Sequence, residues 1–107
     1  MKSPIDILIE KGYGEIVIVF NDPSYEDALI GLTDEYNAVY DFDLMVEWLM
    51  NHDDMTAEDA ADFISYNSSY CYGAHYPVIY YETFEYEEDE EKLTFTKLED
   101  LKDYYEN

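Results

Sequence analysis

The chain has 107 residues, with 27 Asp and Glu against five Lys and no Arg, which gives a formal net charge of −22. Such a charge is typical of disordered chains, but 48% hydrophobic and 18% aromatic residues are too many for one. We therefore expect a single folded domain over residues 1–107 that tolerates strong self-repulsion, although this repulsion destabilises the compact state.

The charge distribution excludes several classes of partner. Residues 12–91 contain 21 Asp and Glu and no Lys or Arg. Direct binding to nucleic acid is close to excluded because phosphate contacts need cations, and binding to anionic lipid is disfavoured for the same reason. No run approaches 18 apolar residues, and the N-terminal stretch is too charged for a signal peptide. With a lone Cys71, the sequence favours a cytoplasmic location.

The first elements follow from local signals. Ser3 and Pro4 are suited to an N-cap and a first helical position, and Gly12 or Gly14 ends the short helix that they begin. The β-branched run "EIVIVF" at 15–20, bounded by the turn residues "NDPS", predicts a buried strand.

The middle of the chain predicts a hairpin and then a helix. The segments 27–33 and 38–42 flank the turn "DEYN" and are expected to pair as strands. Apolar residues recur at helical spacing in "DFDLMVEWLMNH" (41–52), for which Asp41 or Asp43 is a suitable cap.

The second half predicts a further helix, one or two strands and a last helix. In 55–67, Thr56 and Asp59 have the spacing of a capping box ahead of an apolar face. The Tyr-rich alternation of 76–84 predicts a strand, and "KLTF" is a possible short strand before a C-terminal helix over 96–107. The fold class expected is therefore α+β, with a small, mostly antiparallel sheet of three to five strands and helices packed on one face.

Catalytic and metal-binding readings are weak. "DFD" (41–43) and "HDD" (52–54) lack the glycine and the distal Glu of a calcium loop. Cys71 and His75 supply only two zinc ligands, with His52 far away in sequence, and as a nucleophile and base they have no Arg to stabilise an oxyanion. A carboxylate pair at the spacing of a glycosidase is expected by chance among 27 acids. We expect no enzyme, metal or cofactor.

A cluster of tyrosines allows three interpretations. These residues pack in the core and on a sheet face, bind a protein partner, or stack on bases, and stacking normally requires a basic groove that this chain lacks. The cluster consists of Tyr66, Tyr70, Tyr72, Tyr76, Tyr80 and Tyr81.

The density of negative charge indicates imitation of DNA. Spread over the surface expected for 12.7 kDa, 22 charges come within a factor of about three of the density on duplex DNA. The alternative is a protein that is merely soluble or adapted to salt, although such adaptation would not obviously remove every Arg.

The densest stretch is "FEYEEDEE" (84–91), whose acidic part, 85–91, is expected to be a loop that is either a solvated linker or part of a binding surface. If it is a surface, neutralising 87–91 reduces partner binding and leaves the fold intact. If binding survives, the surface lies among the carboxylates of 22–62. The candidate partner-binding residues are Glu85, Glu87, Glu88, Asp89, Glu90, Glu91, Asp41, Asp43, Asp53, Asp54, Tyr70 and Tyr72.

Residues 25–82 carry a resemblance. "DALIGLTDEYNAVYDFDLMVEWLM", "MTAEDAADFISYN" and "PVIYYE" resemble a mostly uncharacterised family of small acidic proteins of phages and mobile elements in Gram-positive bacteria. Members of that family usually continue with a Thr-x-Arg-Ala stretch, where this chain has "SSYCYGAH" and then the acidic run and a further segment.

The resemblance implies an anti-defence role of the anti-CRISPR or anti-restriction type. The function expected is a non-enzymatic DNA mimic that binds the basic nucleic-acid groove of a bacterial defence nuclease, with the Cas9 type favoured. The alternative is an acidic module that binds a basic host or phage regulatory protein without imitating DNA. The oligomeric state stays open.

Overall fold

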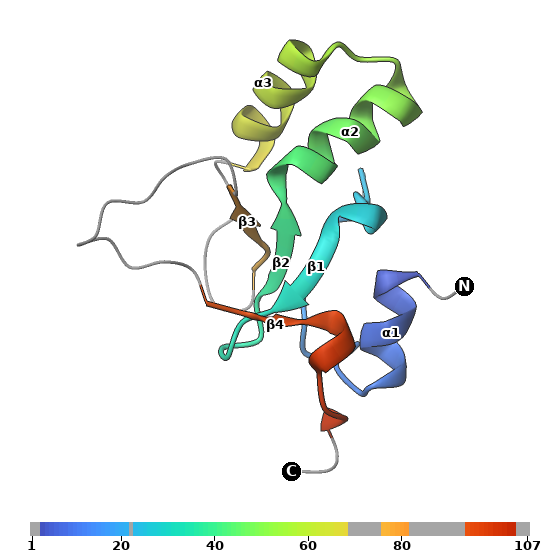
Figure 1. Ribbon diagram of the computed structural model, residues 1–107, viewed down its shortest axis with the longest axis vertical. Coiled ribbons are helices and arrows are strands. Elements are labelled where there is room, and N and C mark those ends of the chain that lie inside the picture. The colour runs from blue at the N-terminus through green and yellow to red at the C-terminus, as the bar shows by residue number, and fades with distance from the viewer. Residues whose placement is uncertain (1–2, 22, 69–75, 82–93, 105–107) are drawn as a thin grey trace, which may run out of the picture.

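The computed structural model describes residues 3–21, 23–68, 76–81 and 94–104, and it confirms the α+β class (Figure 1). Its elements in chain order are α1 (Pro4–Glu10), the 3₁₀ turn η1 (Glu26–Ala28), β1 (Leu29–Leu32), β2 (Ala38–Asp41), α2 (Phe42–Asp53), α3 (Ala57–Ser68), β3 (Val78–Tyr80), β4 (Thr96–Lys97) and the 3₁₀ turn η2 (Leu98–Asp100).

The sheet has the strand order β3-β2-β1-β4 and is mixed. β1 pairs antiparallel with both β2 and β4, as the prediction of a mostly antiparallel sheet requires. β2 and β3, however, are parallel. Parallel strands need a long crossover connection, and α2 and α3 lie in the chain between these two strands.

The predicted hairpin about "DEYN" is confirmed by β1 and β2. The Thr33 amide donates to the Asn37 carbonyl at 3.0 Å, and the Asn37 amide donates to Thr33 Oγ1, also at 3.0 Å. Tyr36 has a positive φ of 65°, so the turn is held by these hydrogen bonds against a conformation that non-glycine residues seldom adopt.

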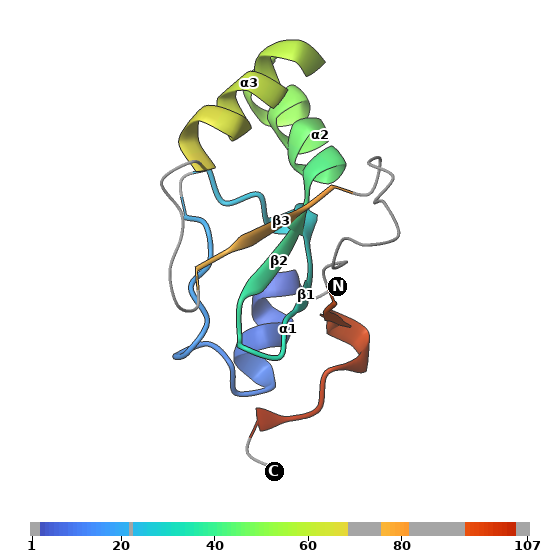
Figure 2. The ribbon, with the colours of Figure 1, turned by 90° about the vertical axis from the view of Figure 1, so that its left-hand side faces the viewer.

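The short helix predicted to begin at Ser3 and Pro4 is confirmed as α1, and both of its ends agree with the prediction. The Asp6 amide donates to Ser3 Oγ at 3.2 Å, which satisfies one of the free amides of the first turn. Gly12 follows the C-cap with a φ of 94°, a conformation that only glycine adopts without steric cost, and the helix ends there. α1 lies beside β1, on the side of the sheet away from β3 (Figure 2).

The two central helices are also confirmed, with the caps that the sequence predicts. β2 runs into α2 without a loop, because Asp41 ends the strand and its Oδ1 accepts from the Leu44 amide at 3.0 Å. Thr56 Oγ1 accepts from the Asp59 amide at 3.1 Å and caps α3. The two helices pack against each other beyond the end of β2 (Figure 1). Within the described ranges, no helix has the length and apolar character needed to cross a membrane.

The strand predicted over 15–20 is wrong. These residues have no regular secondary structure, although Val17 is buried. The Val17 amide donates back to the Tyr13 carbonyl, and the Phe20 amide donates to the hydroxyl of Tyr40 at 3.1 Å. Both edges of β1 are occupied, one by β2 and one by β4. A β-branched run therefore packs apolar side chains here without joining the sheet.

The C-terminal helix predicted over 96–107 is wrong for its described part. Thr96 and Lys97 form β4, and the 3₁₀ turn η2 follows it directly. The pairing with β1 depends on Gly31, because a Cβ there would overlap the Thr96 carbonyl and the Phe95 ring. The strand predicted over 76–84 is confirmed at Val78–Tyr80, and the acidic run 85–91 lies outside the described residues.

Contacts between aromatic rings link part of the core, whose buried residues are otherwise aliphatic. Tyr40 is completely buried, and the ring of Phe20 lies between it and Tyr25, with ring centroids 4.8 and 5.4 Å away. Trp48 of α2 extends the series at 5.6 Å from Tyr25. Edge-to-face pairs of this kind stabilise a fold beyond the area they bury, and none of them depends on charge.

Lys11 joins the C-terminal segment to α1. Its ammonium group donates to the carbonyls of Leu98 and Leu101 at 3.1 and 2.6 Å. The Tyr104 amide donates to the Lys11 carbonyl at 2.7 Å, and the Tyr13 hydroxyl donates to the Lys102 carbonyl at 2.6 Å. This cation therefore stabilises backbone carbonyls of a segment some ninety positions away.

We predict that Lys11→Met loosens the C-terminal segment. The substitution removes two charge-assisted hydrogen bonds, which should lower the free energy of unfolding by about 1.5–3 kcal/mol and weaken amide-exchange protection over 98–104. Lys102→Met is the matched control, because it removes the same charge from an exposed side chain. Equal stability of the two variants would show that the bonds of Lys11 contribute nothing.

We also predict a loss of stability at alkaline pH. Burial raises the pKa of Tyr40 to about 12, although the hydrogen bond from Phe20 lowers it, and burial followed by the charge of Asp53 raises that of Tyr25 to about 12. Both pKa values lie above the value of about 10 for tyrosine in the unfolded chain. The two buried tyrosines therefore contribute fully to the free energy of unfolding below pH 10, and this contribution is lost as pH rises toward 12.

Urea unfolding between pH 9 and 12 measures this effect. Tyr40→Phe should flatten the decline above pH 10, and at neutral pH it should cost about 1–2 kcal/mol by leaving the Phe20 amide unpaired. Tyr76→Phe is the control, because this side chain is exposed. A decline that is equally steep in the Tyr40 variant would contradict the assignment.

Candidate functional site

The α2–α3 hairpin, residues 42–68, is a strongly acidic part of the described fold. The sequence of this hairpin contains no Lys or Arg. Its exposed carboxylates are Asp43, Glu47, Asp53, Asp54, Glu58, Asp59 and Asp62.

The charge density of the hairpin approaches that of DNA. Each helix has 12 residues and is therefore about 18 Å long. Seven exposed carboxylates over that length give about one charge per 2.6 Å, against one per about 1.7 Å of duplex axis. The described hairpin alone therefore comes within a factor of about two of the linear charge density of DNA.

Some of these carboxylates are explained by helix stability. Asp41, just before the hairpin, is only 7% exposed and caps α2. Asp43, Glu58 and Asp59 lie in first turns, where the helix dipole favours negative charge. Asp54 ends α2 with a φ of 55°, which Asp tolerates better than most residues. These five positions therefore have a structural role whether or not a partner binds.

The other three carboxylates oppose helix stability. Glu47 follows Asp43 by four residues, and Asp62 follows Glu58 by four, so each pair places like charges on one helix face. Asp53 lies in the last turn of α2, where the dipole disfavours negative charge, and only His52 in that turn is basic. Packing and capping give no reason for these carboxylates.

The structure places three of the predicted partner-binding residues on the hairpin surface: Asp43, Asp53 and Asp54. Asp41 is buried and serves as a helix cap instead. The remaining predicted residues lie outside the described part of the chain, and they are Glu85, Glu87, Glu88, Asp89, Glu90, Glu91, Tyr70 and Tyr72.

Tyr66 belongs to the predicted tyrosine cluster but not to the predicted partner-binding residues, and it lies on the surface. It is 71% exposed, whereas Ala60 and Ile64 of the same helix are buried. It follows Glu58 by eight residues and Asp62 by four, which places it on the acidic face of α3. The helical spacing alone could have identified it, because positions 60 and 64 mark the opposite face.

An aromatic contact supports the end of α2. The rings of Trp48 and His52 stack with centroids 4.1 Å apart and planes 10° from parallel, and His52 Nδ1 lies 2.8 Å from the Trp48 carbonyl. The Trp48 indole nitrogen is buried and has no hydrogen-bond partner within the described residues. The stack fixes the last turn of α2, next to Asp53.

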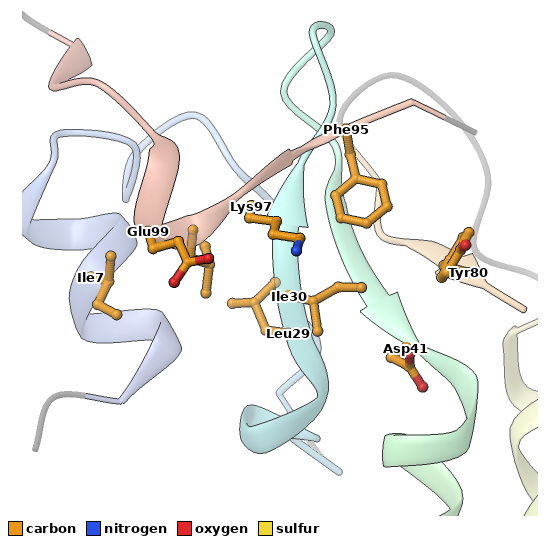
Figure 3. A pocket seen from close by; sticks show the side chains of 9 residues that line it. Ile7, Leu29, Ile30, Asp41, Tyr80, Phe95, Lys97 and Glu99 are labelled. Atoms are coloured by element: carbon orange, nitrogen blue, oxygen red, sulfur yellow. The ribbon is translucent and has the colours of Figure 1, made fainter. Parts of the chain in front are cut away.

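A second candidate is a hollow of about 590 Å³ on the sheet (Figure 3). Its size suits a small ligand, and its walls are mostly apolar. Its polar groups do not converge, because Asp41 is committed to the cap of α2, and Lys97 and Glu99 are exposed. The lining residues are Ile7, Leu29, Ile30, Asp41, Tyr80, Phe95, Lys97, Leu98 and Glu99.

The hollow and the rest of the described surface hold no evident metal site. Across residues 3–21, 23–68, 76–81 and 94–104, no three His, Cys, Asp or Glu side chains gather in a way that could hold a metal ion. His52 lies on α2, while Cys71 and His75 lie outside these ranges. The acidic hairpin is therefore the feature that carries a functional argument.

Comparisons of the chain with protein-family models, with curated proteins and with solved structures find no match. The resemblance to acidic proteins of phages and mobile elements therefore stays a prediction.

Proposed function

We propose that this protein is a non-enzymatic DNA mimic that acts in the bacterial cytoplasm. Its acidic surface occupies the basic nucleic-acid groove of a defence nuclease. The favoured target is an RNA-guided nuclease of the Cas9 type, whose DNA channel is positively charged, and a restriction enzyme is the second choice.

One observation carries this proposal: the α2–α3 hairpin concentrates exposed carboxylates to within a factor of about two of the linear charge density of DNA and contains no Lys or Arg to neutralise them. Glu47, Asp53 and Asp62 oppose helix stability, so their presence supports a role in binding. The alternative of a merely soluble acidic protein does not require charges at positions that destabilise their own helices.

The mechanism is electrostatic and steric. Carboxylates of the hairpin accept charge-assisted hydrogen bonds from Arg and Lys side chains that would otherwise contact phosphates. Association is steered by the opposite charges, so it is fast at low salt and slows as salt rises. The target is blocked for as long as the protein stays bound, and no bond is made or broken.

A second candidate function is an acidic module that binds a basic regulatory protein without imitating DNA. The exposed Met50 and Tyr66 on the hairpin favour it, because apolar anchors serve recognition of proteins and have no counterpart in a phosphate backbone. Competition separates the two functions, since duplex DNA displaces a mimic and leaves a module docked elsewhere in place.

We predict that neutralising the hairpin weakens binding to a purified Cas9-type nuclease at least tenfold, because close charge pairs across interfaces contribute strongly to affinity. Affinity is measured by calorimetry at two NaCl concentrations, with and without competing duplex DNA. The hairpin variant combines Asp43→Asn, Glu47→Gln, Glu58→Gln and Asp62→Asn.

A matched control removes as many charges elsewhere and should change affinity by less than about twofold, as expected for charges away from an interface. It combines Asp6→Asn, Glu15→Gln, Glu99→Gln and Asp100→Asn, all at exposed positions. An equal loss of affinity in the hairpin variant and in the control variant would show that binding depends only on the net charge of the protein. Binding that survives hairpin neutralisation and is lost on neutralising 87–91 would place the surface in the acidic run instead. Failure to bind nucleases of either class would overturn the proposal.

A further inference from the structure

Large apolar side chains lie on the solvent-facing side of the acidic hairpin. Tyr66 of α3 is 71% exposed, and Met50 of α2 is 40% exposed. Each continues an acidic stripe, because Met50 follows Glu47 by three residues and Tyr66 follows Asp62 by four. Both helices therefore combine carboxylates with an apolar group on the face opposite their buried residues.

The core does not account for the position of Tyr66. α3 packs inward through Ala60 and Ile64, which are 0% and 1% exposed. Glu58, Asp62 and Tyr66 recur every four residues on the other face, about 6 Å apart along the axis. A side chain of a binding partner that reaches this face therefore meets a carboxylate and an aromatic ring one helical turn apart.

Arginine is the side chain that uses both groups. Its planar guanidinium pairs with a carboxylate and stacks on an aromatic face, whereas the compact ammonium of lysine is strongly hydrated and stacks less well. One turn of helix is a short enough separation for a single guanidinium to contact Asp62 and the ring of Tyr66 together.

We propose that the outer face of α3, formed by Glu58, Asp62 and Tyr66, is a docking surface for arginine side chains of a basic protein. The charge of the hairpin selects a cationic partner, and Tyr66 makes the surface prefer arginine over lysine. This proposal rests on the proposed function for the basic character of the partner, and it adds the residue type that the site recognises.

The test compares two peptides of equal charge, nona-arginine and nona-lysine, by calorimetry with the full chain at about 0.15 M NaCl. The wild type should bind nona-arginine about two- to fivefold more tightly, as expected for exposed cation–π contacts. Tyr66→Ser should abolish this preference and leave the affinity for nona-lysine unchanged, whereas Tyr66→Phe should retain it. Asp62→Asn should weaken the binding of both peptides.

The control variant is Tyr76→Ser, which removes another exposed tyrosine outside the hairpin and should keep the preference. Equal affinity of the wild type for both peptides, or an unchanged preference in Tyr66→Ser, would overturn the proposal. The peptide measurements are made without a nuclease, so they test the arginine preference separately from the proposed function. If the protein prefers arginine peptides but binds no nuclease, only the proposed function would be overturned.

Discussion

The scarcity of cationic side chains is the constraint on which the rest of this structure depends. With 27 acidic residues against five lysines, ion pairs cannot hold the fold together, and Lys11 donates to two backbone carbonyls. Stability has to come from apolar burial, from aromatic pairs such as Phe20 with Tyr40, and from caps such as Asp41. A fold stabilised in this way leaves nearly all of its described carboxylates on the surface.

The separation between an apolar core and an acidic surface has a functional consequence. The sheet, α1 and the α2–α3 hairpin all contribute buried residues to the core, and the hairpin projects beyond the end of β2 (Figure 1). Because Met45, Leu49, Ala60 and Ile64 anchor the two helices, their outer faces need only remain polar. Those faces carry carboxylates at positions that oppose helix stability, which supports the interpretation of the hairpin as a binding surface.

The sequence predicted correctly those helices and turns that are determined by neighbouring residues, such as helix caps and turn residues. Ser3, Asp41 and Thr56 cap the three helices as expected, and the turn "DEYN" joins β1 to β2. The predictions that proved wrong concern segments whose structure depends on pairing with strands that are distant in the sequence. The run at 15–20 has strand character but no free strand edge at β1, and Thr96, which has the spacing of a helix cap, pairs with β1 beside Gly31. For the site, charge predicted the acidic surface, but burial removed Asp41 from it and added Tyr66.

The central claim is that the hairpin keeps its carboxylates for a partner and at a cost in stability. Its most direct test is the unfolding free energy of the wild type and of a variant that combines Glu47→Gln, Asp53→Asn and Asp62→Asn, measured from about 10 mM to 500 mM NaCl. The account predicts that the neutralised variant is the more stable at low salt and that the difference shrinks as salt screens the repulsion. A neutralised variant that is less stable than the wild type at low salt would show that these carboxylates serve the fold, and it would contradict the account.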